Sequence, residues 1–122
     1  MPCILVVDDN DEHVELVNRI LTARGYTVVA AGDAETGLQA AVDHDPDLIL
    51  LDLGLPDVDG QTLVGLMRRV PELTHTPIIA VTAWPQETAR EMVEAYGCAG
   101  YISKPIVRIT DLVDQVASHL RR

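Results

Sequence analysis

Reactive polar side chains follow four short apolar runs of this sequence. Asp8 and Asp9 come directly after the first run, Asp52 ends another, Thr82 ends the next, and Lys104 follows the last. A short, continuous apolar run is typical of a strand that is buried on both faces. Each of these polar groups is therefore predicted to lie at the carboxyl end of a buried strand.

Carboxylates that are brought together in this way repel one another and favour a bound cation. Oxygen ligands suit Mg²⁺, which usually takes one or two carboxylates together with phosphate oxygens. Lys104 would place positive charge opposite the cation, and the Thr82 hydroxyl could donate to a phosphoryl oxygen. A histidine-activated nucleophile is not expected, because all four histidines fall on predicted helices or distant loops: His13, His44, His75 and His119. The predicted nucleophile is a carboxylate, which forms an acyl phosphate when it attacks phosphorus.

The elements that would position these groups alternate along the chain. The expected strands are residues 3–7, 27–30, 47–52, 77–82 and 101–103. Helical spacing of apolar residues separates and follows them. It predicts a helix over 11–24, two helices with Asp33 and Thr110 as N-caps, a helix after Gly60, and a helix with Pro85 as its first residue. Parallel strands need crossover connections, which are right-handed. The pattern predicts an α/β fold, a doubly wound five-stranded parallel sheet with five helices on its two faces, whose functional crevice lies at the carboxyl ends of the strands.

Length, charge and cysteine content narrow the class of protein. The chain has 122 residues and a formal net charge of -10, which predicts one domain over 1–122 and argues against partners such as nucleic acid or an anionic membrane surface. No apolar run is long enough to span a bilayer. Cys3 and Cys98 have no metal-ligand spacing and are expected to be reduced, so a cytoplasmic protein is expected.

Taken together, four motifs resemble the receiver domain of two-component response regulators, of the single-domain chemotaxis-regulator type. They are Asp8-Asp9, Asp52 within Leu-Leu-Asp-Leu-Gly-Leu-Pro-Asp-Val-Asp-Gly, Thr82-Ala83, and Lys104-Pro105. The resemblance covers essentially the whole chain. It implies a flavodoxin-like three-layer sandwich with strand order 2-1-3-4-5, and it implies that the Lys104-Pro105 bond is cis.

The resemblance also implies a cofactor and a phosphoryl acceptor. Asp52 would take a phosphoryl group from a phosphohistidine on a sensor histidine kinase or a phosphotransfer protein. Asp9 and Asp52 would ligate Mg²⁺ directly, with the Gly54 carbonyl as third protein ligand and Asp8 acting through water. The implied function is phosphorelay signalling rather than enzymatic turnover.

The remaining implied roles concern switching. Lys104 would contact the phosphoryl group, Thr82 would turn inward to hydrogen-bond it, and Tyr101 would move into the vacated space. The face formed by the fourth helix, fifth strand and fifth helix, which carries Tyr96 and Tyr101, would bind a downstream protein. A homodimer is also compatible with the resemblance.

Simpler interpretations of the same residues stay open at this point. Asp8 or Asp9 could be a helix N-cap, since acidic residues are common there. Thr82 and Tyr101 are also ordinary strand residues, and Lys104 could be a solvated surface lysine.

Two other functions compete on the same fold. A small Mg²⁺-dependent phosphatase could turn over an aspartyl phosphate, but the second aspartate expected two residues after the nucleophile is missing, because Leu53 and Gly54 follow Asp52. A nucleotide or flavin binder would need a glycine-rich phosphate loop, and neither a Gly-x-x-x-x-Gly-Lys loop nor a Ser/Thr-Gly-rich loop follows the first strand.

Overall fold

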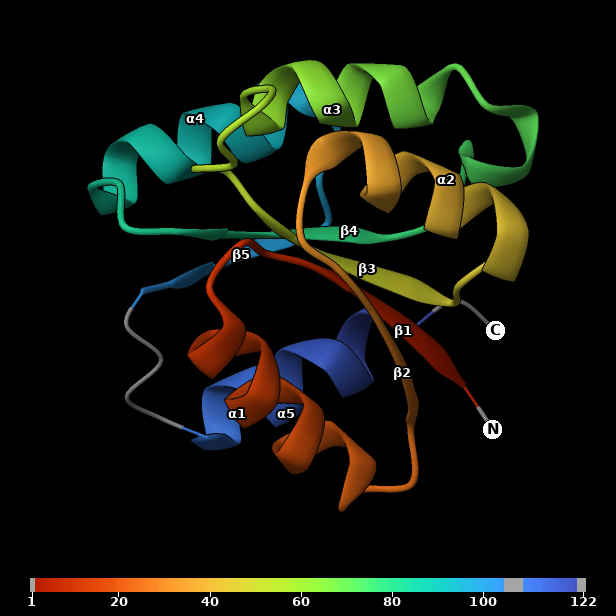
Figure 1. Ribbon diagram of the computed structural model, residues 1–122. Coiled ribbons are helices and arrows are strands. Elements are labelled where there is room, and N and C mark those ends of the chain that lie inside the picture. Colours follow the sequence, from red (N-terminus) through yellow and green to blue (C-terminus); the bar gives the residue numbers. More distant parts are fainter. Residues whose placement is uncertain (1, 105–108, 121–122) are drawn as a thin grey trace.

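Strands and helices alternate along the chain in the computed structural model, which describes residues 2–104 and 109–120 (Figure 1). The strands are β1 Cys3–Val7, β2 Thr27–Ala31, β3 Leu48–Asp52, β4 Ile78–Thr82 and β5 Gly100–Ser103. The helices are α1 Asp11–Thr22, α2 Ala34–His44, α3 Gly60–Arg68, α4 Gln86–Tyr96 and α5 Ile109–His119, with a 3₁₀ turn, η1, at Pro71–Leu73. All strand pairs are parallel, in the order β2-β1-β3-β4-β5, which confirms the predicted fold class.

Helices cover both faces of the sheet, α1 and α5 on one and α2, α3 and α4 on the other (Figure 1). Strand residues alternate between the two layers. In β1, Ile4 and Val6 belong to the core beneath α1 and α5, whereas Leu5 and Val7 belong to the core beneath α2, α3 and α4. This explains why the strands are continuous apolar runs. Within the described residues, no helix combines the length and the apolar character needed to cross a membrane.

Several helix ends differ from the sequence-based expectation, for local reasons. The N-cap of α1 is Asn10, whose side chain accepts a hydrogen bond from the His13 amide, so neither Asp8 nor Asp9 is the cap. Pro85 takes the N-cap position of α4 with an extended ψ of 148°, one residue before the helix. Thr110 lies within α5, which begins at Ile109. The expected cis bond before Pro105 falls outside the described residues.

Arg68 ties three segments together at the end of α3. Its Nη1 donates to the carbonyl oxygens of Leu73 and Thr76 at 2.8 and 2.7 Å, and its Nη2 donates to that of Gly97 at 3.0 Å. Gly97 is the left-handed C-cap of α4, with φ of 72°. The guanidinium therefore holds the end of α3 against the approach to β4 and against the end of α4.

The loop that follows β3 packs closely onto the start of α3. Asp59 caps α3 by accepting a hydrogen bond from the Thr62 amide at 2.9 Å. Gly60, the next residue, lies so near Leu53 that an added Cβ would come within 2.7 Å of the Leu53 Cα. The absence of a side chain at Gly60 thus permits the close approach of α3 to the segment just beyond Asp52.

Candidate metal-binding site

The strand register brings the predicted carboxylates together. Val7 of β1 pairs with Leu51 of β3, so the next residue of each strand, Asp8 and Asp52, lies at the same edge of the sheet. Carboxylate oxygens of Asp8, Asp9 and Asp52 all lie within 4.8 Å of one another. Asp8 and Asp52 are 3% and 5% exposed, whereas Asp9 is exposed. The site therefore consists of two buried carboxylates and one carboxylate that is open to solvent.

Lys104 reaches into this cluster instead of standing in solvent. Its Nζ lies 3.3 Å from Oδ2 of Asp8 and 3.1 Å from Oδ2 of Asp52. Its backbone amide donates to the Thr82 carbonyl at 2.8 Å, which extends the pairing of β4 and β5 by one residue and aims the side chain. Burial disfavours the charged ammonium, but the contacts with both carboxylates outweigh it and raise the pKa of Lys104.

The two buried carboxyl groups are held in different electrostatic states. Burial disfavours the ionised form of Asp8, but hydrogen bonds from His13 and the Asn10 amide, together with the charge of Lys104, lower its pKa to about 2. Burial, aided by the charge of Asp8, raises the pKa of Asp52 despite a 2.9 Å hydrogen bond from the Gly54 amide to Oδ1 and the contact with Lys104. Asp8 is thus firmly anionic, and Asp52 is the more basic carboxylate of the pair.

The predicted switch residues, Thr82 and Tyr101, lie on the neighbouring strands β4 and β5. The buried Thr82 accepts a 2.9 Å hydrogen bond from the Trp84 amide through Oγ1. Tyr101 is partly buried against the core beneath α2, α3 and α4, and its carbonyl oxygen accepts a hydrogen bond from Gln115 of α5 at 2.8 Å. Asp52 pairs with Val81, the residue before Thr82, and Tyr101 pairs with Ala80 of the same strand.

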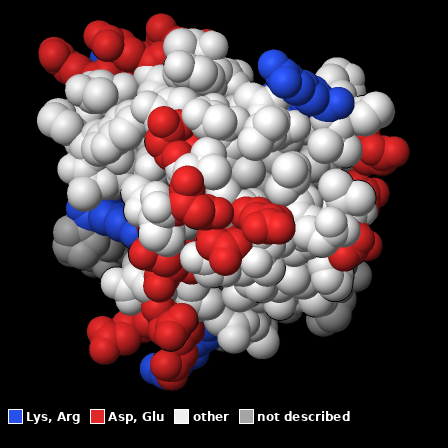
Figure 2. Space-filling view, turned by 45° about the horizontal axis from the view of Figure 1, so that its top comes forward, with Lys and Arg blue, Asp and Glu red and all other residues white. Residues whose placement is uncertain are grey.

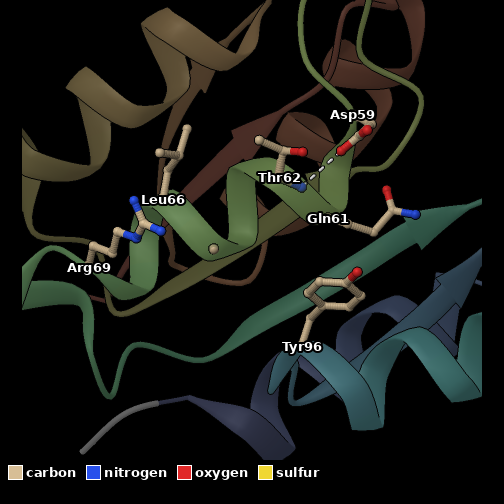
Figure 3. A pocket seen from close by; sticks show the side chains of 7 residues that line it. Asp59, Gln61, Thr62, Leu66, Arg69 and Tyr96 are labelled. Carbon is tan, nitrogen blue, oxygen red and sulfur yellow. Dashed lines mark hydrogen bonds between the residues drawn. The ribbon is translucent and has the colours of Figure 1, made fainter.

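Tyr96, the other aromatic of the expected partner face, lines a groove between α3 and α4 (Figure 3). The groove has a volume of about 450 Å³, and Tyr96 is 45% exposed. The other residues that line it are Asp59, Gln61, Thr62, Gly65, Leu66 and Arg69. None of the three carboxylates of the acidic cluster lines this groove, so the two sites are separate.

The donor set of the acidic cluster fits a hard divalent cation. Three carboxylate oxygens lie close enough to share one ion, and oxygen ligands are those that Mg²⁺ prefers. Acidic side chains also gather across the middle of the face shown in Figure 2, with few basic side chains among them. This distribution agrees with the formal net charge of -10 and attracts cations toward this face.

Sequence reasoning missed one residue of this site. The helical spacing places His13 on the first helix and gives it no part in the chemistry, yet its Nδ1 contacts Oδ2 of Asp8. The available signal was its position as the third residue of α1, because a side chain there can fold back toward the residues before the helix.

The parallel sheet carries two buried carboxylates and a lysine at its carboxyl edge, and this arrangement is found in a known family of α/β domains. Residues 4–117 match the family model described as the response regulator receiver domain, and the chain belongs to this family. A polar-differentiation response regulator, DivK of Brucella ovis, is 34% identical over 117 residues, which cover 96% of this chain and 94% of the relative.

Solved structures agree with this family assignment. The chemotaxis protein CheY4 of Vibrio cholerae has a TM-score of 0.91 at 27% identity, with 98% of this chain and 99% of that chain covered. A CheY-like receiver domain protein of Methanospirillum hungatei has a TM-score of 0.87 at 28% identity, covering 97% and 92% of the two chains. The protein is therefore a receiver domain of phosphorelay signalling, whose partners include a histidine kinase, and it is not a conventional enzyme.

Proposed function

We propose that Asp52 is the phosphoryl acceptor and that Asp8, Asp9, Gly54, Thr82 and Lys104 serve that reaction. The observation that carries the proposal is the setting of the Asp52 carboxylate. It is buried, its Oδ1 is fixed by the Gly54 amide, and its Oδ2 faces the Lys104 ammonium at 3.1 Å. A nucleophile held in this way by a donor and a cation is oriented before its substrate arrives.

The phosphoryl transfer to Asp52 needs no separate general base. An Asp52 oxygen attacks phosphorus and the bond between phosphorus and the imidazole nitrogen of the donor breaks. The nitrogen keeps the electron pair, and an acyl phosphate forms on Asp52. Because the attacking group is a carboxylate, no proton has to be removed from it. Lys104 stays beside the acceptor and offsets the negative charge that arrives with the phosphoryl group.

Mg²⁺ would be held directly by Asp9, Asp52 and the Gly54 carbonyl, with Asp8 acting through water. When bound, the cation would neutralise charge on the phosphoryl oxygens. The close approach of the three carboxylates supports this arrangement. Asp9 is the exposed member and is therefore the side chain that can adjust to an incoming ion.

Mg²⁺ is expected to raise the melting temperature of the protein, and Asp9→Asn is expected to remove most of that rise. A cation that binds only the folded chain, at about ten times its Kd, stabilises it by about 1.4 kcal/mol. Thermal unfolding of both proteins with and without millimolar Mg²⁺ measures the effect. A full Mg²⁺ response in the Asp9→Asn protein would show that Asp9 is not a ligand.

The output of the switch is a change in protein contacts. Thr82 would exchange its hydrogen bond with the Trp84 amide for one to the phosphoryl group, and Tyr101 would move inward in response. The face formed by α4, β5 and α5 would then bind a downstream protein, or a second copy of the chain as a homodimer. A histidine kinase or a phosphotransfer protein is the proposed donor. We place residues 1–122 in one functional unit in the cytoplasm, which suits the free cysteines Cys3 and Cys98.

Acetyl phosphate with Mg²⁺ provides a direct test of this function. Intact-mass measurement is expected to detect one phosphoryl adduct per chain. Sustained release of phosphate from unrelated phosphate esters, with no adduct, would instead favour the Mg²⁺-dependent phosphatase.

A further inference from the structure

The imidazole of His13 is directed at the acidic cluster by the start of α1. The His13 backbone amide donates to the Asn10 side chain at 3.1 Å, which fixes the first turn of the helix. From there the side chain, only 12% exposed, reaches back to Oδ2 of Asp8. Its other ring nitrogen, Nε2, is buried and has no hydrogen-bond partner among the described residues. Among the described residues, the contact with Asp8 is thus the one hydrogen bond that the His13 ring makes.

The direction of this hydrogen bond follows from the groups that surround Asp8. Its Oδ2 also faces the Lys104 ammonium at 3.3 Å, and a carboxylate in such an ion pair can only accept hydrogen bonds. Nδ1 of His13 therefore carries the hydrogen and donates it. Oδ1 of Asp8 accepts from the Asn10 amide at 3.0 Å, so each oxygen of the carboxylate receives a donor from the start of α1.

Lys104 is the third group bound to Asp8, and it differs from the other two in mobility. Its Nζ bridges Asp8 and Asp52 at the end of a long, flexible side chain. In the proposed function this ammonium also contacts the phosphoryl group on Asp52, so its contact with Asp8 depends on the state of Asp52. The Asn10 amide and the His13 ring belong to the start of α1 and can hold Asp8 in the same orientation before and after that change.

We propose that His13 is a positioning residue that orients the Asp8 carboxylate and thereby sets the affinity of the site for a divalent cation. The inference rests on the proposed function of Asp8, Asp9 and Asp52 as the cation site. His13 is not itself a ligand in this scheme, since the cluster whose oxygens could share an ion consists of the three carboxylates alone. Asp8 would hold the ion through water, and loss of an outer hydrogen-bond partner of a metal site commonly changes metal affinity by about 10- to 100-fold.

Two substitutions of His13 distinguish the loss of its hydrogen-bond donor from the loss of its side-chain volume. His13→Leu keeps much of the volume and removes the donor, so the Kd for Mg²⁺ is expected to rise about 10-fold. His13→Asn places an amide nitrogen on Cγ, where Nδ1 stands in histidine, and is expected to recover most of the affinity. His44→Leu, which replaces an exposed histidine in the last turn of α2, is the matched control and should leave the Kd unchanged.

The Kd is measured on the full chain by two-dimensional NMR, following the amides of Gly54 and Asp9 as Mg²⁺ is added. The spectra also report whether each variant is folded. If His13→Leu does not fold, the comparison of His13→Asn with His13→Met provides the same contrast. As a further check, the His13→Leu substitution should have no effect on the Kd in an Asp8→Ala protein, because His13 acts through Asp8 and alanine leaves it no acceptor.

The outcomes distinguish this inference from the proposed function. No Mg²⁺ binding by the wild-type protein would overturn both. Normal binding by wild type and an equal Kd in His13→Leu would overturn only the positioning role. A Kd in His13→Asn as weak as that in His13→Leu would also overturn it, because the donor would then be irrelevant.

Discussion

Asp52→Asn is expected to abolish phosphoryl labelling by acetyl phosphate and Mg²⁺ completely, because an amide is not a nucleophile toward phosphorus. Intact-mass measurement of wild type and variant gives the result directly. Fold integrity is expected to survive. Burial raises the pKa of Asp52, so its ionised form opposes folding at neutral pH, and that unfavourable effect grows as the pH rises through its folded-state range. The neutral asparagine removes it, so the melting temperature at neutral pH should be at least that of wild type.

Two neighbouring aspartates provide matched controls for this substitution. Asp57 accepts a hydrogen bond from the Ala34 amide at 2.9 Å, and Asp59 accepts one from the Thr62 amide at the same distance. Both accept hydrogen bonds from amides at helix N-termini, and neither belongs to the acidic cluster. Asp57→Asn and Asp59→Asn should therefore still be labelled. Labelling that persists in Asp52→Asn, or that disappears in Asp57→Asn, would place the acceptor elsewhere.

Gly60→Ala is expected to destabilise the fold by about 3 kcal/mol, the upper part of the usual range for overpacking. The added Cβ would meet the Leu53 Cδ2 atom at 2.3 Å and the backbone Cα of Leu53 at 2.7 Å. A side-chain terminus can rotate away, but the backbone beside Asp52 cannot move without shifting the end of β3. Urea denaturation, followed by circular dichroism, measures the change in the free energy of unfolding.

Gly65→Ala in the same helix is expected to change the free energy of unfolding in the opposite direction. Nothing lies within 4 Å of a Cβ at Gly65, so the substitution adds helix propensity without a clash and should stabilise by about 0.5–1 kcal/mol. The contrast separates steric exclusion at Gly60 from a general effect of alanine in α3. Similar free energies of unfolding for the two variants would contradict the close approach of α3 to Leu53.

The fold was predictable because its main signals are local. Each buried strand is a continuous apolar run, and Asp8 and Asp52 follow two such runs that the parallel register then aligns. Convergence of the carboxylates therefore follows from the topology alone. Helix ends were less predictable, since Asn10 rather than an aspartate caps α1 and Pro85 precedes α4 instead of opening it. Several neighbouring residues can cap a helix about equally well, and the spacing of apolar residues does not show which of them does so.

The electrostatics of the acidic cluster could not be predicted from the sequence, because they depend on the positions of individual side-chain atoms. Repulsion among the carboxylates was expected from their residue types, but the hydrogen bonds and the ammonium that relieve it at Asp8 depend on side-chain orientation. The contact of His13 with Asp8 depends on a helix start defined to the residue.

The two ends of α4 are held by different hydrogen bonds, while Met92 packs the middle of the helix into the core. At its carboxyl end, Arg68 clasps the Gly97 carbonyl and joins α4 to α3. Just before its amino end, the Trp84 amide donates a hydrogen bond to Thr82. If Thr82 turns toward a phosphorylated Asp52, as proposed above, and gives up that bond, the amino end of α4 loses a contact while the Gly97 end keeps its own. A partner that binds the first turn of α4 would then sense the change more directly than one that binds beside Tyr96.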